Sequence, residues 1–391
     1  MHPFTYYAPT EVVFGPGTEE KAGTYVKKYG GSRVLVVYGG GSACRSGLLD
    51  RVGEALTGAG LAWTGFGGAK PNPTLAHARE GVRAALDFGA DFVLAVGGGS
   101  AIDTAKAIAH GAANPERDLW DFWSRKAALE RSTPVGVILT IPAAGSEMSN
   151  SAVLTNEDLP RKRGLNTDLN RPKFAILNPE LTLTLPPYQV ACGVVDIMMH
   201  TLDRYFNPLD NPLTDALAEG LLRTVIAQGR RALTQGPDYS AMSELMWAGS
   251  LSHNGLTGLG GRGDWAVHQL GHELSARFDL AHGASLAAVW GSWAEYVMPA
   301  RPERFARYAR QVWDVREEED AAAARAGIRA TVDYFAALGM PTSFGPCVGV
   351  QTPETLADMA YRCAYEGTRT IGTLRVLEQE DIRRIYEAAN R

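Results

Sequence analysis

Short apolar runs recur through the first half of the chain, and they constrain its fold more than any other feature. The runs Val34–Tyr38, Phe92–Val96 and Val135–Leu139 alternate with stretches of helical periodicity, and two of them stop at glycines. Continuous apolar runs are typical of parallel strands that helices connect and cover. One such helix is predicted over residues 74–88, where four apolar residues recur at helical spacing: Leu75, Ala78, Val82 and Leu86.

The character of the sequence changes after Leu185. Pro186-Pro187 begins a series of long helical patterns that continues to Arg391 with few β-branched runs. A chain of 391 residues with 45% hydrophobic residues is long and apolar enough for two domains with separate cores. We therefore expect an α/β domain over residues 1–185 and an all-α domain over residues 186–391.

Charge and hydropathy argue against several classes of protein. The formal net charge is −5, whereas a chain that binds nucleic acid normally has a basic excess. No apolar run approaches the roughly 18–20 residues that cross a bilayer, and residues 1–7 lack the pattern of a signal peptide. The four cysteines form no CxxC pair, which disfavours a thiolate zinc site. We expect a cytoplasmic protein with neither nucleic acid nor membrane as a partner.

The turn Gly97–Ser100 leads from a predicted strand into a predicted helix that Ser100 is placed to cap. Glycines allow a diphosphate to approach the backbone, and the N–H groups of a helix N-terminus stabilise its charge. However, Ile102 stands where the third glycine of a GxGxxG fingerprint belongs, and no Gly-Lys-Ser/Thr follows. By itself this motif fits a dinucleotide site and a ligand-free turn equally well.

A second glycine turn, Gly39–Ser42, follows Tyr38. Dinucleotide sites that bind a ribose 2′-hydroxyl place an acidic side chain here, and its carboxylate repels a 2′-phosphate. This chain has glycines instead, so that the backbone amides near Gly40 and the Ser42 hydroxyl can bind a phosphate, with Arg45 close in sequence. We predict NADP(H) as the cofactor, with NAD as the alternative; a flexible turn without ligand is the other interpretation.

Asp196 and His200 lie four residues apart in an otherwise apolar helical segment, so both side chains share one helix face. Burial of a carboxylate without a partner is costly. A bound cation removes this cost, and an Asp–His hydrogen bond does so less well. We therefore favour a metal site over a purely structural pair.

A second segment spaces His268 and His272 four residues apart, and His282 follows. It differs from the HExxH motif of zinc proteases, in which the general-base glutamate directly follows the first histidine. Gln269 takes that place here, and Glu273 comes only after the second histidine. Peptide hydrolysis is therefore disfavoured.

One carboxylate and three imidazoles suit a single divalent metal, Fe(II) or Zn(II), with a position left open for a substrate oxygen. The predicted ligands are Asp196, His200, His268 and His282. His272 is then either a core histidine or a side chain that contacts substrate or cofactor. A metal and a nicotinamide cofactor together favour hydride transfer to a carbonyl group.

These motifs resemble those of the iron-dependent (group III, metal-containing) alcohol dehydrogenase family, and the resemblance covers essentially the whole chain. Asp196 and His200 match its DxxxH motif, and the three later histidines match its HxxxH and HG motifs. Gly97–Lys106 matches its GGGSxxDxxK loop, and Thr140–Glu147 matches its T-x6-E segment.

The resemblance implies a Rossmann-like α/β dinucleotide-binding domain, a helical metal-binding domain, an active-site cleft between them, and a homodimer. Gly39–Ser42 and Asp264–Leu274 look most like the branch of NADPH-dependent butanol dehydrogenases and broad-range aldehyde reductases. By matched position the resemblance also implies a set of cofactor contacts: Gly39, Asn72, Gly98, Gly99, Ser100, Asp103, Thr140, Lys162 and Leu181.

The predicted function is that of a metal-dependent NADP(H) alcohol dehydrogenase or aldehyde reductase. It would transfer hydride between nicotinamide and a metal-bound small aldehyde or primary alcohol, with His272 or a water relay supplying the proton. One alternative is a metal- and dinucleotide-dependent lyase resembling dehydroquinate synthase, in which Arg161–Arg163 would have to bind a phosphate group. Another is a binding module that keeps the fold without catalysis.

Overall fold

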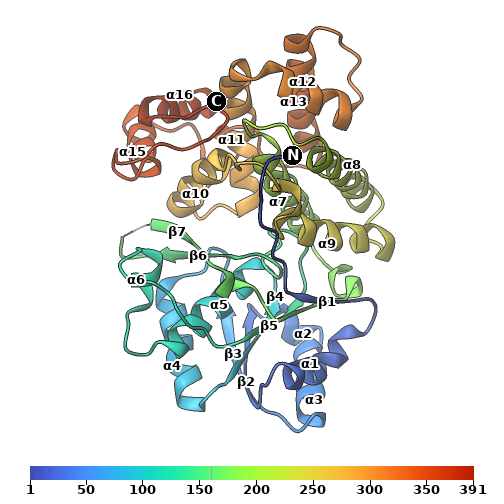
Figure 1. The fold of residues 1–391 in the computed structure, drawn as a ribbon, viewed down its shortest axis with the longest axis vertical. Helices are drawn as coiled ribbons and strands as arrows, with labels where there is room; N and C mark the ends of the chain where they lie inside the picture. The colour runs from blue at the N-terminus through green and yellow to red at the C-terminus, as the bar shows by residue number, and fades with distance from the viewer. Residues whose placement is uncertain (160) are drawn as a thin grey trace. The chain divides into compact units, whose positions relative to one another are not determined.

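The computed structural model describes residues 1–159 and 161–391, and Figure 1 labels their helices and strands. The contacts among these residues divide the chain into two compact units. The sheet unit comprises Tyr7–Leu185 and Pro237–Asn254, and the helical unit comprises Met1–Tyr6, Pro186–Gly236 and Gly255–Arg391. The predicted division into domains at residues 185 and 186 stays a prediction, because contacts alone do not test which segments fold independently.

Among the described residues, the sheet unit contains a six-stranded parallel sheet in the order β1-β8-β5-β4-β2-β3. Its strands are β1 (Glu11–Phe14), β2 (Arg33–Gly39), β3 (Ala62–Ala69), β4 (Phe92–Gly97), β5 (Val135–Leu139) and β8 (Phe174–Leu177). A separate antiparallel hairpin pairs β6 (Ser151–Asn156) with β7 (Arg161–Asn166). The three apolar runs singled out in the sequence form β2, β4 and β5, which confirms their prediction as parallel strands.

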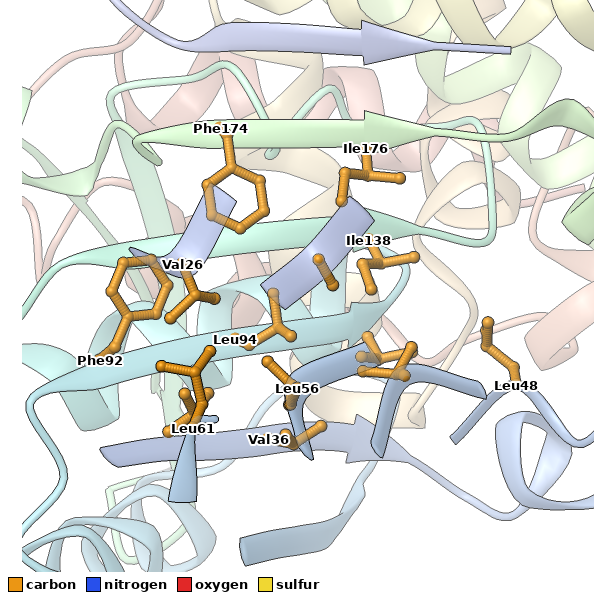
Figure 2. Close-up of a cluster of buried hydrophobic side chains, with 14 of the residues drawn as sticks. Val26, Val36, Leu48, Leu56, Leu61, Phe92, Leu94, Ile138, Phe174 and Ile176 are labelled. Carbon is orange, nitrogen blue, oxygen red and sulfur yellow. The ribbon is translucent and has the colours of Figure 1, made fainter. Parts of the chain in front are cut away.

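Successive side chains of a strand point to opposite faces of this sheet, and helices cover both faces. Val36 packs with helices α1 (Ala22–Lys28) and α3 (Leu48–Gly58) on one face, in the cluster that Figure 2 shows. Val37, the next residue, packs with helices α4 and α5 on the other face. The helices and short turns of this unit are η1 (Thr18–Lys21), α1 (Ala22–Lys28), α2 (Ser42–Arg45), α3 (Leu48–Gly58), α4 (Leu75–Phe88), α5 (Gly99–Ala113), α6 (Leu119–Trp123), η2 (Asp168–Asn170), η3 (Pro179–Thr182) and α9 (Tyr239–His253).

Helix α4 confirms the helix predicted over residues 74–88, and Thr74 caps its N-terminus through a side-chain hydrogen bond. The face predicted for it is wrong at one position, because Leu86 is 43% exposed. Leu86 lies in the last turn, just before the left-handed Gly89 that ends the helix, and there the neighbouring Ala85 is buried instead.

Helix α9 belongs by its contacts to the sheet unit, although it follows helices of the other unit in the chain. The Nδ1–H group of His253 donates a hydrogen bond of 2.5 Å to the carbonyl oxygen of Ala144. Gly145 has a φ of +63°, and a Cβ atom at this position would lie 2.5 Å from the carbonyl oxygen of Gly249. Helix α9 therefore packs directly on the segment that follows β5.

The described part of the helical unit has helices and one isolated bridge, between Ile371 and Leu377, which confirms the predicted helical second domain. Its elements are α7 (Pro187–Tyr205), α8 (Pro212–Thr234), η4 (Leu256–Gly258), α10 (Ala266–Phe278), α11 (His282–Val297), η5 (Met298–Ala300), α12 (Pro302–Trp313), α13 (Asp320–Ala337), α14 (Gly345–Val348), α15 (Pro353–Cys363) and α16 (Gln379–Ala389). No helix in residues 1–159 and 161–391 is both long and apolar enough to span a bilayer.

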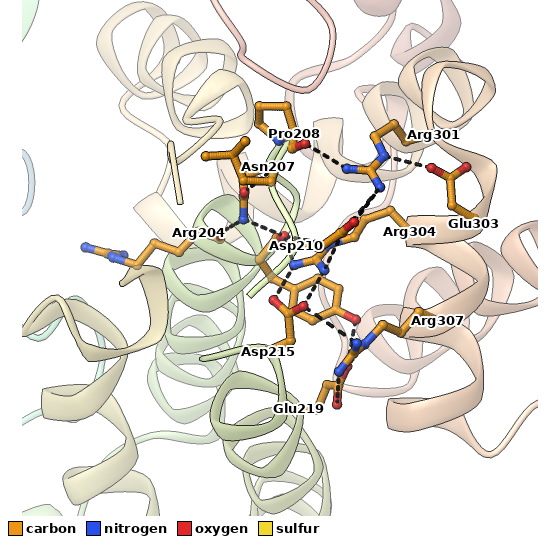
Figure 3. A network of polar contacts seen from close by, with 12 residues as sticks. Arg204, Asn207, Pro208, Asp210, Asp215, Glu219, Arg301, Glu303, Arg304 and Arg307 are labelled. Atoms are coloured by element: carbon orange, nitrogen blue, oxygen red, sulfur yellow. Dashed lines mark hydrogen bonds and ion pairs between the residues drawn. The ribbon is translucent and has the colours of Figure 1, made fainter. Parts of the chain in front are cut away.

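A buried ion-pair network joins helices α7, α8 and α12 within the helical unit (Figure 3). Arg304 donates two hydrogen bonds of 2.6 Å to the carboxylate of Asp215, and both side chains are almost fully buried. The same guanidinium donates to the carbonyl oxygen of Tyr205, the last residue of α7. The final carbonyls of a helix have no partner within the helix, so Arg304 stabilises the end of α7. Beside it, Arg307 pairs with Glu219 at 2.7 Å.

Asp215→Ala should strongly destabilise the protein, because it leaves the Arg304 guanidinium buried without its carboxylate. Breaking a buried pair in this way costs about 3–5 kcal/mol. We expect a fall of this size in the free energy of unfolding, measured by urea denaturation of the whole chain. Glu380→Ala removes exposed ion pairs with Arg383 and Arg384 and should leave that free energy almost unchanged. Equal effects of the two variants would contradict the prediction.

Candidate active site

Asp196 and His200 lie one turn apart on helix α7, and the packing of this helix buries both side chains. The Nε2 atom of His200 is 3.4 Å from the Oδ1 atom of Asp196. Most of α7 from Val190 to Tyr205 is buried, as expected of a helix that is apolar nearly all round. The carboxylate and the imidazole are therefore held together away from solvent.

His282 is the first residue of helix α11, and the glycine after it lets this helix end approach α7. A Cβ atom at Gly283 would lie 2.2 Å from the carbonyl oxygen of Cys192, so only glycine fits there. His282 thereby places its Nε2 atom 3.7 Å from Oδ1 of Asp196. The close contact between the two helices gives a physical reason for the glycine of the HG motif.

His268, on helix α10, completes a cluster of possible metal ligands. Among the described residues, Asp196, His268 and His282 each offer one ligand atom, and these atoms lie within 4.8 Å of one another. His200 is outside this triplet, but its ring centroid is 4.4 Å from that of His268. The four predicted ligands thus lie near one another, and three of them each offer a ligand atom close enough to the other two to share one ion.

The ring of His268 indicates what this cluster is suited to hold. Its Nδ1 atom lies 2.5 Å from the Oδ2 atom of Asp203. Its Nε2 atom is buried and, within residues 1–159 and 161–391, has no hydrogen-bond partner. A buried polar atom without a partner is costly, and a cation can bind the imidazole lone pair. Carboxylate and imidazole donors fit Fe(II) or Zn(II).

His272, the predicted catalytic residue, lies one turn after His268 on α10 and is also buried. Its ring centroid is 6.3 Å from that of His268 and 5.5 Å from that of His282. His272 is therefore a neighbour of the cluster, and it is not part of the triplet of ligand atoms.

Two acidic residues beside the cluster are absent from the predicted site. Asp203 follows Asp196 by seven residues, and this spacing places it on the same face of α7 as the ligands, which is a signal that the sequence does carry. Asp264 accepts hydrogen bonds from the backbone N–H groups of Ala266 and Leu374 and fixes the start of α10. Burial raises the pKa of Asp264 to about 6. Its role depends on a distant segment, so spacing gives no sign of it.

In the sheet unit, predicted cofactor residues lie at the carboxyl ends of parallel strands. Gly39 ends β2, and Thr140 follows β5, with its N–H group bonded to the carbonyl oxygen of Gly97 at the end of β4. Leu181, in η3, packs against the cluster of Figure 2. Strand β3 lies on one side of β2, and the next strand in the chain, β4, lies on the other side. The direction in which successive strands are added to the sheet therefore reverses between β2 and β4. Open α/β sheets bind nucleotides at such switch points.

The turn between β4 and α5 lies directly against the segment after β5. Cβ atoms added at Gly98 and Gly99 would lie 3.1 Å from Ile141 and 3.4 Å from Ala144, respectively. Helix α5 begins at Gly99, with Gly98 as its N-cap and no side-chain cap. The predicted cap by Ser100 is wrong, because the helix begins one residue before it. The backbone N–H groups at this end are thus left without a side-chain acceptor.

The positively charged side chain of Arg45 lies close to the glycine turn that follows β2. Gly41 has a φ of +75°, and a Cβ atom there would lie 2.9 Å from the Nη1 atom of Arg45, so the guanidinium folds back over the turn. Ser42 begins the one-turn helix α2. Residues 39–49 contain no acidic side chain. This combination of glycine, hydroxyl and guanidinium suits a phosphate group.

Lys162 and Asn72, both predicted to contact the cofactor, contact each other. The Nζ atom of Lys162 donates a hydrogen bond of 2.8 Å to the Oδ1 atom of Asn72. Asn72 itself has a φ of +56°, a left-handed conformation that asparagine tolerates better than most residues. The hairpin strand β7 therefore places its lysine beside the turn that precedes α4.

Asp103 and Lys106 in the GGGSxxDxxK loop bind the protein itself. The carboxylate of Asp103 accepts hydrogen bonds from the hydroxyl of Ser146 at 2.6 Å and from the N–H of Val153 at 2.9 Å. The fully buried Nζ of Lys106 donates to the carbonyl oxygens of Ser146 and Ser151. Burial lowers the pKa of Lys106 to about 8. Both side chains hold the segment between β5 and the hairpin in place.

Comparison with known proteins identifies the chain by family. The family model described as iron-containing alcohol dehydrogenase matches residues 9–179, and that of the Fe-containing alcohol dehydrogenase family, C-terminal, matches residues 190–390. The chain is 39% identical to the NADH-dependent butanol dehydrogenase A of Clostridium acetobutylicum, over 99% of both chains. It is 36% identical to the NADPH-dependent aldehyde reductase YqhD of Escherichia coli, over the full length of both.

The solved structures agree with these sequence relatives. The NADH-dependent butanol dehydrogenase A of Thermotoga maritima superposes with a TM-score of 0.96 at 35% identity, covering 100% of this chain and 99% of that one. Both the parallel sheet and the helical second domain are therefore features shared with such enzymes. The chain belongs to the iron-containing alcohol dehydrogenase family and is an oxidoreductase.

Proposed function

We propose that this protein is a metal-dependent, NADP(H)-linked aldehyde reductase and alcohol dehydrogenase acting on small aldehydes and primary alcohols. The observation that carries the proposal is the convergence of Asp196, His268 and His282, whose ligand atoms lie within 4.8 Å of one another. The relatives that support the substrate class include butanol dehydrogenases and an aldehyde reductase.

The proposed ligands of one divalent metal, Fe(II) or Zn(II), are Asp196, His200, His268 and His282. When bound, such a metal supplies a Lewis acid that polarises the carbonyl group of the substrate. The protein's own contribution is to hold Asp196, His200 and His268 in buried positions beside the partly exposed His282. Burial also strengthens the electrostatic interactions on which carbonyl reduction depends.

The proposed cofactor residues of the sheet unit bind and orient the dinucleotide, whose nicotinamide supplies the hydride. The backbone N–H groups of Gly98, Gly99 and Ser100 lie at the N-terminus of α5, where they and the helix dipole would stabilise a pyrophosphate. Gly39, Gly40 and Ser42 form the turn that would bind the adenosine ribose. The remaining proposed contacts are Asn72, Asp103, Thr140, Lys162 and Leu181.

NADP(H) is proposed over NAD because the turn after β2 has Arg45 and no carboxylate. A 2′-phosphate gains a charge-assisted hydrogen bond from a guanidinium, whereas an unphosphorylated ribose does not. Named relatives include enzymes described as NADH-dependent and one described as NADPH-dependent, so the family alone does not decide the cofactor.

His272 is proposed as the proton donor. Reduction of a carbonyl requires a proton at the product oxygen, and histidine is the side chain best suited to supply one near neutral pH. Its ring lies 5.5 Å from that of His282, close enough for a small substrate or one water molecule to bridge to the cluster.

The lyase alternative is less well supported than the dehydrogenase. Relatives matched over nearly the whole chain are named as dehydrogenases and a reductase, and the chain has the ligand motifs of their family. We also propose a cytoplasmic homodimer, following the family resemblance of the sequence. Continuous consumption of NADPH distinguishes the two activities, because a lyase of this kind regenerates its cofactor in each turnover.

Removal of the metal should abolish the proposed activity. We expect treatment with a chelator to lower the rate of NADPH oxidation with butanal by at least about 10²-fold, because the electrostatic stabilisation at the carbonyl is lost. Addition of Fe(II) or Zn(II) should restore the rate, and elemental analysis of untreated protein identifies the native ion. Full activity in a rigorously metal-free sample would exclude this function.

Arg45→Ala should weaken the binding of NADPH specifically. Loss of one charge-assisted hydrogen bond to the 2′-phosphate is worth about 1.4 kcal/mol, or roughly tenfold in KM for NADPH. The KM for NADH should stay the same, because it has no phosphate at that position. Arg79→Ala, which removes an exposed pair with Asp118, is the control. Parallel changes in both KM values would show that Arg45 only supports the turn.

His272→Ala should slow proton transfer without loss of metal. We expect kcat for butanal reduction to fall by about 10²-fold, the usual contribution of a general acid. Metal content and the dissociation constant of NADPH should remain those of the unmodified protein. If instead the variant loses its metal, His272 is a structural or ligating residue and the assignment is wrong.

A further inference from the structure

The strongest polar contact of the His268 ring is with Asp203. The Nδ1 atom of His268 lies 2.5 Å from Oδ2 of Asp203, and the Asp203 side chain is 1% exposed. A carboxylate oxygen accepts hydrogen bonds and does not donate them, so the proton of this bond belongs to Nδ1. The lone pair of the ring is then on Nε2, which is buried, has no hydrogen-bond partner among the described residues and is left as the nitrogen that His268 can offer to a metal.

Asp203 also fixes the backbone of the helix that carries His268. Its carbonyl oxygen accepts a hydrogen bond of 2.6 Å from the N–H of Asp264, two residues before α10 begins. One residue of α7 therefore holds α10 at two points, the chain before its first turn and the ring of His268. This double attachment determines both the position of the ring and its rotation.

The next residue along α7 adds to the same arrangement. Arg204 donates a hydrogen bond of 2.6 Å to the carbonyl oxygen of His200 and stacks on the ring of Trp265, 4.5 Å from its centroid. Trp265 lies in a left-handed conformation at the start of α10, with its ring 5.5 Å from that of His268. Charged groups near the Asp203–His268 bond include the guanidinium of Arg204 and the carboxylates of Asp264 and Asp196.

We propose that Asp203 is a positioning residue for the metal centre: it keeps the proton of His268 on Nδ1, directs Nε2 at the ion, and makes that nitrogen a stronger donor. The inference rests on the proposed metal-dependent function and goes beyond it, because it assigns a role outside the set of ligands. Carboxylates that hold metal-binding histidines in this way typically change metal affinity 10–100-fold when they are replaced.

The test compares metal affinity and not activity alone. Asp203→Asn keeps the shape of the side chain but removes its charge, and Asp203→Glu restores a carboxylate. Zn(II) affinity is measured for each full-length variant by competition with a chelator. We expect Asp203→Asn to bind Zn(II) about 10–100-fold more weakly, and Asp203→Glu to recover most of the loss. The Co(II)-substituted Asn variant should also show a changed visible spectrum.

Asp264→Asn is the matched control. Asp264 is a buried carboxylate just before the same helix, but it accepts hydrogen bonds from the backbone N–H groups of Ala266, Thr373 and Leu374 rather than from a ligand ring. This variant should melt at a lower temperature and yet keep the Zn(II) affinity and the Co(II) spectrum of the unmodified protein. A purely structural role of Asp203 would instead give both variants the same behaviour, which would overturn the proposal.

Two further outcomes separate this inference from the proposed function. If the unmodified protein binds Zn(II) and Asp203→Asn binds it equally well, the role of Asp203 is refuted while the metal centre stands. If the unmodified protein binds no metal, both fail. Should Asp203→Asn not fold, ¹⁵N NMR of the Zn(II)-loaded unmodified protein decides, since the proposal requires a proton on Nδ1 of His268 and metal on Nε2; the opposite tautomer refutes it.

Discussion

The burial of one carboxylate, Asp196, is the constraint on which the packing around the candidate metal ligands depends. A charge in the middle of an apolar helix costs several kcal/mol unless its surroundings compensate it. Imidazoles from three helices lie around it, with His200 on the same helix and His268 and His282 on α10 and α11. Each helix must approach closely to deliver its ring, which is why a glycine follows His282. Both the stability of the fold and the proposed metal binding therefore require that α7, α10 and α11 pack closely together.

A different constraint applies to the sheet unit, because the proposed binding of a dinucleotide requires accessible backbone groups at its glycine turns. Its glycine turns follow β2 and β4, on either side of the point where the order of strands reverses. A Cβ atom at Gly98 would lie 3.1 Å from Ile141, which is tighter than most such contacts, whereas a Cβ atom at Gly99 would make an ordinary contact with Ala144 at 3.4 Å. Asp103 and Lys106 stabilise the segment after β5 through hydrogen bonds to its backbone and to the side chain of Ser146.

Features that depend on local periodicity were predicted correctly from the sequence, whereas features that depend on long-range contacts were not. Strands β2, β4 and β5 and helix α4 follow from patterns within a few residues, and the ligand motifs bring together side chains that the structure also places together. The exposed Leu86 and the uncapped start of α5 depend on where each helix ends, which periodicity does not define. The position of Asp203 beside the ligands could have been predicted, because its spacing from Asp196 and His200 places it on the same helix face. Asp215 was not, since its partner Arg304 is 89 residues away.

The path of the chain has a consequence for its modularity. The backbone passes between the two units after residues 6, 185, 236 and 254, because α9 returns to the sheet unit from within the other. A fragment that ended at residue 185 would lack the helix that covers Gly145 and bonds to Ala144, and would expose an incomplete surface there. Exchange of one whole unit between relatives by recombination would thus require several coordinated breakpoints.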